Sequence, residues 1–142
     1  ERLSLHPVQA PWKKVYISRK LAPKRKAHNE QEVENFLRNQ GFEIVYAEKL
    51  SLLEQIQLMS ETSLLVCLHG AALTNMLFLP RTAKVLELRN VGDVITQCYF
   101  NLASALELTY FYTLNSGDSK DTIMTDFTID LEALRIALSE IE

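Results

Sequence analysis

The sequence has little of what marks secreted mini-proteins, fibrous proteins and membrane proteins. Its 142 residues include two cysteines, four glycines and four prolines. Two cysteines cannot build a disulfide framework, and we expect Cys67 and Cys98 to be small buried apolar side chains. No apolar run approaches the roughly 20 residues of a membrane-spanning helix. The composition, 47% hydrophobic and 23% charged, is typical of a globular domain with its own core.

The start of the sequence lacks a targeting signal. No charged segment followed by an apolar run and a cleavage site opens it, and the chain begins abruptly at Glu1. We therefore expect residues 1–142 to be a single domain cut from a longer chain.

Familiar catalytic motifs are missing as well. There is no GxxxxGK[ST] phosphate loop, no GxGxxG after the first predicted strand and no GxSxG nucleophile turn. Three histidines and two cysteines have no zinc-ligand spacing. No acidic cluster ends the first strand, which disfavours a receiver-type phosphoryl-transfer domain. The sequence thus predicts no metal site and none of these reaction types.

Charge is unevenly distributed, although the net charge is only −3. Residues 13–26 carry seven basic and no acidic side chains, whereas residues 116–142 carry seven acidic and two basic ones. A basic block can attract phosphate groups. For any single lysine within it, a solvated loop edge is the simpler interpretation.

Hydrophobic patterning predicts alternating strands and helices. Short apolar or β-branched runs predict strands at residues 15–17, 42–46, 64–68, 84–88 and 108–114. Helices are predicted to begin near Asn29, Ser51, Ala71 and Asp93, with a last helix at 131–141 and a polar loop at 115–121. This alternation is typical of a parallel sheet with helices on both faces and right-handed crossovers.

Helix-end signals support several of these helices. Asn29 with Glu32, and Ser51 with Glu54, have the spacing of a capping box. Gly41 is expected to end the first helix. The second helix is predicted to bury Leu52, Ile56 and Met59.

The turn after the third predicted strand, His69-Gly70-Ala71, is the strongest candidate for a ligand site. In an open parallel sheet, ligands bind beyond the carboxyl ends of the strands, where the strand order reverses. Gly70 has no Cβ to block a ligand, and the following helix start offers free N–H groups and a positive dipole end. His69 at the lip can donate to a phosphate oxygen, and Arg19, after the first strand, can present a bidentate fork to the same anion. A core histidine and a surface ion pair are the respective alternatives.

An ordered set of motifs resembles glycosyltransferase family 61 over about residues 15–88. The residues that carry the resemblance are Ser18-Arg19, Arg25 with Asn29-Glu30, Gly41-Phe42, residues 48–51 (EKLS) with Gln55, and residues 69–75 (HGAALTN), followed by Pro80 and Glu87.

The resemblance implies the carboxyl-terminal half of a GT-B glycosyltransferase, a three-layer Rossmann-like α/β domain that holds most of a nucleotide-sugar donor. It implies an inverting, metal-independent transfer to an acceptor hydroxyl without a cofactor, in polysaccharide (capsular in bacteria) or glycan synthesis. The implied donor-site residues are Arg19, Arg25, Asn29, Glu30, His69, Gly70, Ala71, Asn75 and Glu87. No catalytic base is assigned.

The same resemblance implies partners and a compartment. The main partner is a missing amino-terminal domain of the same protein, without which the fragment can be inactive; no nucleic acid and no transmembrane segment are expected. The resemblance implies a cytoplasmic compartment, free or membrane-associated, for a bacterial protein and the secretory lumen for a eukaryotic one.

Two other functions remain to be weighed. One is a non-catalytic module that holds RNA or another polyanion through the basic stretch 13–26, although the acidic net charge and the lack of interleaved aromatic residues argue against it. The other is a degenerate family member kept as a scaffold, which only an assay on the full-length protein separates from an enzyme.

Overall fold

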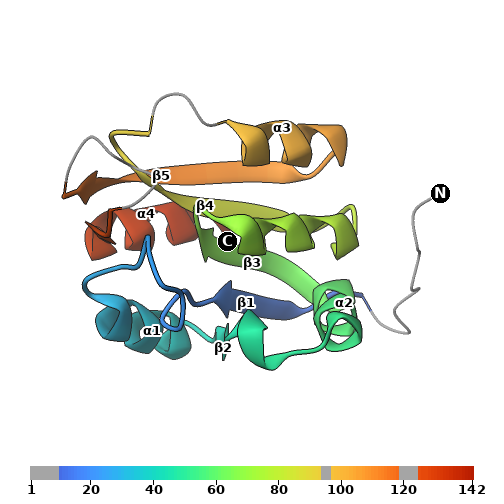
Figure 1. The fold of residues 1–142 in the computed structure, drawn as a ribbon. Coiled ribbons are helices and arrows are strands. Elements are labelled where there is room, and N and C mark those ends of the chain that lie inside the picture. Colours follow the sequence, from blue (N-terminus) through green and yellow to red (C-terminus); the bar gives the residue numbers. More distant parts are fainter. Residues whose placement is uncertain (1–9, 94–96, 119–124) are drawn as a thin grey trace.

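The chain folds around one six-stranded sheet with the strand order β2-β1-β3-β4-β5-β6 (Figure 1). The computed structural model describes residues 10–93, 97–118 and 125–142. Neighbouring strands from β2 through β5 are parallel, and the short β6 is antiparallel to β5. The strands are β1 (Lys13–Ile17), β2 (Glu43–Val45), β3 (Thr62–Leu68), β4 (Lys84–Asn90), β5 (Thr109–Gly117) and β6 (Phe127–Thr128).

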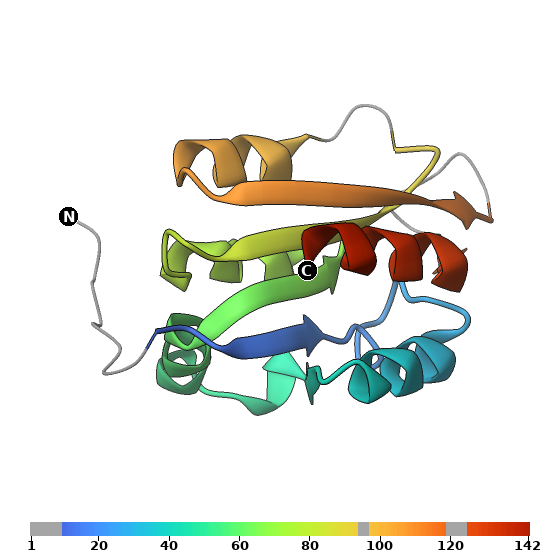
Figure 2. The same cartoon turned by 180° about the vertical axis from the view of Figure 1, so that it is seen from behind.

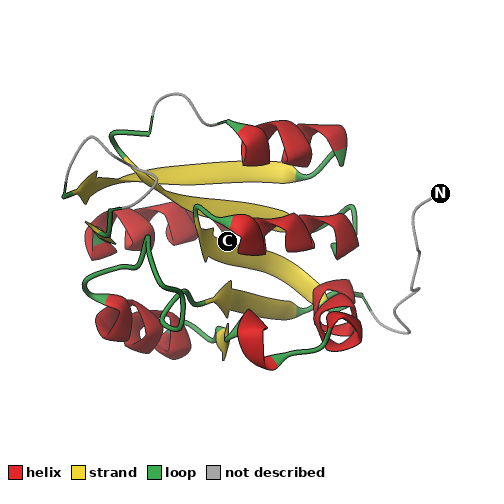
Figure 3. Ribbon diagram, viewed as in Figure 1, coloured by secondary structure: helices red, strands yellow, loops and turns green. Residues whose placement is uncertain are grey.

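Helices cover both faces of the sheet, so the domain has three layers (Figures 2 and 3). The helical segments are α1 (Glu30–Asn39), η1 (Ala47–Lys49), α2 (Leu52–Ser60), η2 (Ala71–Phe78), α3 (Cys98–Ala105) and α4 (Leu131–Ile141). One core cluster packs α1 and α4 against the sheet face that carries Tyr16, Val66 and Leu86. A second cluster packs α2, η2 and α3 against the face that carries Val15, Leu65 and Val85.

The five predicted strands and the parallel α/β order are confirmed. The apolar strand β3 is buried on both faces from Leu64 to Leu68, as expected for a parallel sheet with helices on each side. The antiparallel β6 was not predicted. Segment η2 has 3₁₀ rather than α hydrogen bonding, although its position matches the predicted helix at Ala71.

Three helix ends follow from local chemistry. Ser51 and Glu54 form the predicted capping box, with Ser51 N donating to Glu54 Oε2 at 2.7 Å and Glu54 N to Ser51 Oγ at 3.2 Å. Gly41 ends α1 with a left-handed φ of 86°. Asp130 caps α4 by accepting from Ala133 N at 3.0 Å.

The predicted cap at Asn29 is wrong. Asn29 does occupy the N-cap position of α1, but its side chain makes no capping hydrogen bond. Its Nδ2 donates to Ile129 O at 2.8 Å, and its Oδ1 accepts from Ile129 N at 3.0 Å. The capping box with Glu32 therefore does not form, because the amide binds a segment 100 residues away.

Four further expectations are wrong. Leu52 is 63% exposed, and α2 buries Leu58 and Met59 in its place. Asp93 does not begin a helix, because α3 starts at Cys98 with Gln97 as its N-cap. Cys98 is exposed, whereas Cys67 is buried as predicted. Residues 115–117 belong to β5 rather than to a loop; residues 119–121 of the predicted loop lie outside the described residues.

Among the described residues, no helix is both long and apolar enough to cross a membrane.

Candidate anion-binding site

The carboxyl ends of β1 and β3 meet where the strand order reverses. Strand β1 pairs with β2 on one side and with β3 on the other. The connection from β1 to β2 therefore runs toward one side of the sheet, and the connection from β2 to β3 runs back toward the other. A cavity of about 460 Å³ opens at this edge. Its lining comes from the residues after β1, from η1 and α2, and from η2. This is the place where open α/β sheets bind their ligands.

Arg19 is held over Gly70 at this edge. Its Nε donates to Arg25 O at 3.0 Å, and its Nη2 donates to Lys24 O at 2.9 Å. A Cβ at Gly70 would overlap Nη1 of Arg19 and lie 3.0 Å from Cζ. Gly70 itself has an extended backbone. The requirement for glycine is therefore space for the guanidinium, not a left-handed φ.

A second cation lies beside the first. Burial, and then the charge of Arg25, lower the pKa of the Arg19 guanidinium. Arg25 has a left-handed φ of 54°, and its Nε is buried without a hydrogen-bond partner in the described structure. Neither arginine forms an ion pair with a carboxylate of the described residues. We call Arg19, Arg25 and Gly70 the cavity cluster; an anion would relieve its repulsion.

The loop that carries Arg25 is fixed from the carboxyl-terminal part of the chain. Phe127 N donates to Lys26 O at 3.0 Å, and Lys26 N donates to Asp126 Oδ1 at 2.9 Å. The hydrogen bonds between Asn29 and Ile129 join the same two segments. Asn29 therefore supports the loop from behind and does not line the cavity.

Glu30 lies beneath the cavity in a network of hydroxyl groups. It is 6% exposed, and its Oε1 accepts from Tyr16 OH and from Ser18 Oγ, both at 2.7 Å. Ser18 also lies 2.9 Å from Glu34 Oε1. Burial raises the pKa of Glu30, and the charge of Glu34 adds to this, while the two hydroxyl hydrogen bonds oppose it. Glu30 reaches the cavity only through Ser18, which lines it.

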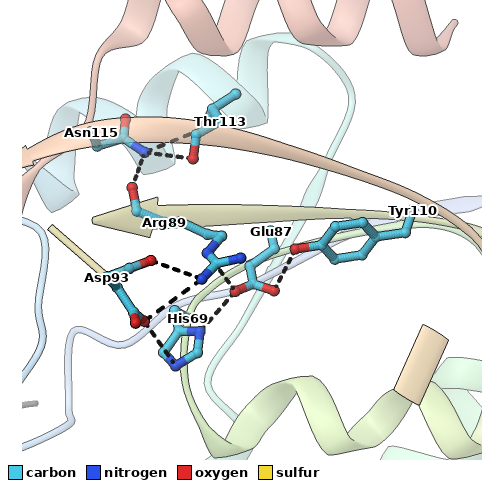
Figure 4. A network of polar contacts seen from close by, with 7 residues as sticks. All are labelled: His69, Glu87, Arg89, Asp93, Tyr110, Thr113 and Asn115. Carbon is cyan, nitrogen blue, oxygen red and sulfur yellow. Dashed lines mark hydrogen bonds and ion pairs between the residues drawn. The ribbon is translucent and has the colours of Figure 1, made fainter. Parts of the chain in front are cut away.

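The His69 ring lies beside Glu87 and Asp93 (Figure 4), and His69 is not among the residues that line the cavity. It is 8% exposed. Its Nδ1 lies 2.7 Å from Glu87 Oε1, and its Nε2 lies 3.5 Å from Asp93 Oδ2. Glu87, which is 1% exposed, accepts from Tyr110 OH at 2.8 Å and lies 3.6 Å from Arg89 Nε. We call these five residues the buried cluster.

Three of the predicted donor-site residues line the cavity directly, namely Arg19, Ala71 and Asn75. Asn75 is 6% exposed and uses its Nδ2 to donate to Ala72 O at 3.0 Å. Gly70 lies under the Arg19 guanidinium, with Arg25 beside it. The other predicted residues, Asn29, Glu30, His69 and Glu87, surround this site from behind or below.

The basic stretch 13–26 does not form one surface. Lys13 and Lys14 lie at the start of β1, where they pair with Glu61 at 2.7 Å and Glu142 at 2.6 Å. Arg19 lies beyond the other end of the same strand. The two halves of the stretch therefore face opposite edges of the sheet.

Sequence reasoning missed the roles of Arg89, Asp93 and Tyr110. The sequence predicts only a helix start near Asp93 and assigns no role to Arg89 or Tyr110. A signal was present, because Glu87 and Arg89 lie two residues apart in β4, a strand that is buried from Val85 to Asn90. Two opposite charges on one face of a buried strand predict a buried ion pair. In the described ranges, no group of three His, Cys, Asp or Glu side chains could hold a metal ion.

Comparison with known sequences connects this site to a family. The profile described as Glycosyltransferase 61 matches residues 3–86. The EGF domain-specific O-linked N-acetylglucosamine transferase of Bos taurus is 38% identical over 84 residues, which cover 56% of this chain and 16% of that protein. The protein of the same name from Drosophila melanogaster is 30% identical over 115 residues, which cover 75% of this chain and 22% of that protein. The chain thus spans only about a fifth of the length of these relatives. It belongs to the glycosyltransferase 61 family.

Proposed function

We propose that this domain binds the nucleotide-sugar donor of a glycosyltransferase, with the donor diphosphate between Arg19 and the Gly70 turn. One observation carries the proposal. Two main-chain carbonyls hold Arg19 over a glycine at the edge where the strand order reverses, and Arg25 stands beside it without a carboxylate partner in the described structure. Glu48 also lines the cavity, but neither arginine forms an ion pair with a carboxylate in the described structure, and such cations are suited to an anionic ligand.

The same geometry suits the chemistry of donor activation. As the bond between sugar and diphosphate breaks, negative charge develops on the leaving diphosphate. Arginine side chains fixed in advance stabilise that charge without reorganising during the reaction. We propose an inverting transfer of this kind that needs no metal ion, with Arg19 and Arg25 supplying the positive charge.

The rest of the active site lies outside this domain in our proposal. The domain is the carboxyl-terminal, Rossmann-like half of a GT-B enzyme, and an amino-terminal domain supplies the acceptor face and the catalytic base. The short fraction of the relatives that the chain spans supports this division. The isolated domain then binds the donor but transfers no sugar.

The names of the relatives support a more specific donor and acceptor. They describe an O-linked N-acetylglucosamine transferase specific for EGF domains. We therefore favour N-acetylglucosamine as the sugar, a protein hydroxyl as the acceptor over a polysaccharide, and the secretory lumen as the compartment.

Calorimetric titration with uridine and guanosine diphosphate tests the proposal. We expect the wild-type chain to bind at least one of them, and Arg19→Ala to weaken that binding about tenfold, because a charged hydrogen bond is worth about 1.5–3 kcal/mol. Arg135→Ala is the matched control, since Arg135 is exposed and pairs with Glu132 on α4. A folded wild-type chain that binds neither diphosphate, or equal affinity for wild type and Arg19→Ala, would contradict the proposal.

A further inference from the structure

The buried cluster connects the Gly70 turn to two neighbouring strands. Hydrogen bonds run from the His69 ring, after β3, to Glu87 on β4 and from Glu87 to Tyr110 on β5 (Figure 4). The main chain of His69 is tied to β4 as well, because His69 N donates to Leu88 O at 3.0 Å. The residue that precedes Gly70 is therefore held to β4 by both its backbone and its ring.

The loop after β4 is fixed to the same ring. Asp93 Oδ2 faces the second ring nitrogen of His69 at 3.5 Å, and Arg89 Nη2 donates to Asp93 O at 3.0 Å. The edge of the Tyr99 ring, on α3, packs against the imidazole with a centroid separation of 5.0 Å. Side chains from β4, from the following loop and from α3 thus contact the His69 ring and fix its orientation.

The buried cluster combines acidic and basic side chains. Two carboxylates, Glu87 and Asp93, face one guanidinium, Arg89, and the imidazole of His69. Both ring nitrogens of His69 face carboxylate oxygens, Nδ1 that of Glu87 and Nε2 that of Asp93. Such a buried polar cluster adds little stability over apolar side chains of the same volume, and its best-attested benefit is a unique conformation.

We infer that His69 and Glu87 are positioning residues: they hold the Gly70 turn in the shape that receives the anion and do not touch the anion themselves. The inference rests on the proposed function for its ligand. Its geometry rests on the contacts above. Neither side chain lines the cavity, whereas Gly70, next to His69, lies directly under the Arg19 guanidinium.

Four variants test the inference. His69→Asn keeps an N–H donor near the position of Nδ1, whereas His69→Leu removes it, and Glu87→Gln weakens the acceptor on a side chain that is 1% exposed. Thr62→Val is the matched stability control. It removes a buried hydrogen bond, Thr62 Oγ1 to Leu58 O at 2.8 Å, at the opposite end of β3.

The first readout is the affinity for whichever of uridine and guanosine diphosphate the wild type binds more tightly. His69→Leu and Glu87→Gln should each weaken it about tenfold, and the double variant should be no weaker than either alone, as expected for residues that act as one unit. His69→Asn and Thr62→Val should bind like the wild type. If Glu87→Gln binds like the wild type while both His69 variants lose affinity, His69 contacts the ligand and the inference is wrong. It is equally wrong if Thr62→Val loses as much affinity as His69→Leu.

The second readout needs no ligand. Hydrogen exchange at the Leu73 amide, which donates to Gly70 O at 3.0 Å, reports on the turn. It should accelerate in His69→Leu and Glu87→Gln and stay unchanged in His69→Asn and Thr62→Val. Unchanged exchange in all four variants overturns the inference. If exchange changes as expected but the wild type binds neither diphosphate, the proposed function fails while the positioning role stands.

Discussion

Two groups of charged side chains adjoin at the carboxyl edge of the sheet, and they are built in opposite ways. In the cavity cluster, Arg19 donates to main-chain carbonyls, and like charges lie side by side. In the buried cluster, His69 and Arg89 face carboxylates. The peptide bond between His69 and Gly70 joins the two. In our proposals, the matched charges hold the shape of the turn, whereas the two arginines beside the cavity bind an anionic ligand.

The largest expected effect is a difference in stability between variants of the two clusters. Glu87→Ala should lower the free energy of unfolding by about 3–5 kcal/mol, because it removes the buried carboxylate that faces the Arg89 guanidinium. Arg19→Ala should lower it by about 1 kcal/mol or less, since it also removes repulsion with Arg25. Urea denaturation followed by circular dichroism measures both. Similar losses for the two variants would erase the distinction between the clusters.

Two glycines sharpen the comparison by function. Gly70→Ala should weaken diphosphate binding about tenfold, because the new Cβ displaces the Arg19 guanidinium. Gly41→Ala is the control: its positive φ of 86° makes the variant less stable by about 1 kcal/mol without touching the cavity. Calorimetry and thermal unfolding on both variants check the pair. Wild-type affinity in Gly70→Ala would show that Arg19 need not lie over this turn.

Salt should act on the two clusters unequally. Diphosphate affinity should fall several-fold between low and high salt, because exposed charges are screened beyond a Debye length of about 10 Å at 0.1 M. The wild-type melting temperature should change little over the same range, because buried pairs are screened much less. Calorimetry and differential scanning fluorimetry in a salt series measure both, and an affinity independent of salt would count against a charge-based site.

The smallest expected effect concerns Glu30, the carboxylate beneath the cavity. Its pKa is raised in the folded chain, mainly by burial. Between the ordinary value of 4.5 and the raised one, the folded state binds more protons than the unfolded state. Stability should therefore be highest at low pH within this window and fall as the pH rises through it. Glu30→Gln should flatten that part of the stability profile, and a parallel profile for both proteins would contradict the assigned cause.

The sequence predicted what depends on neighbours along the chain. Apolar runs located β1 to β5, and the Ser51–Glu54 spacing located a helix start, because both signals act over a few residues. The errors depend on distant partners. The Asn29 amide hydrogen-bonds to the main chain of Ile129, and the Asp93 carboxylate faces the His69 ring, instead of capping the predicted helices. No local pattern carries that information.

The candidate site divides in the same way. The rule for ligand positions in parallel sheets identified Arg19 and Gly70 correctly as neighbours at the sheet edge. It could not specify which way the His69 ring points, because that depends on Glu87 in the next strand. In the structure, the two neighbouring residues therefore face different partners: Gly70 lies under Arg19, and the His69 ring meets Glu87.

The most direct test is a map of ligand contacts on the wild-type chain. Amide chemical shifts recorded by nuclear magnetic resonance during titration with uridine or guanosine diphosphate report where the ligand lies. The account predicts that the largest changes occur at Arg19, Gly70 and Ala71, with none around Lys13 and Lys14 at the opposite edge. Changes centred on those two lysines, or no changes at saturating ligand, would contradict a diphosphate site between Arg19 and the Gly70 turn.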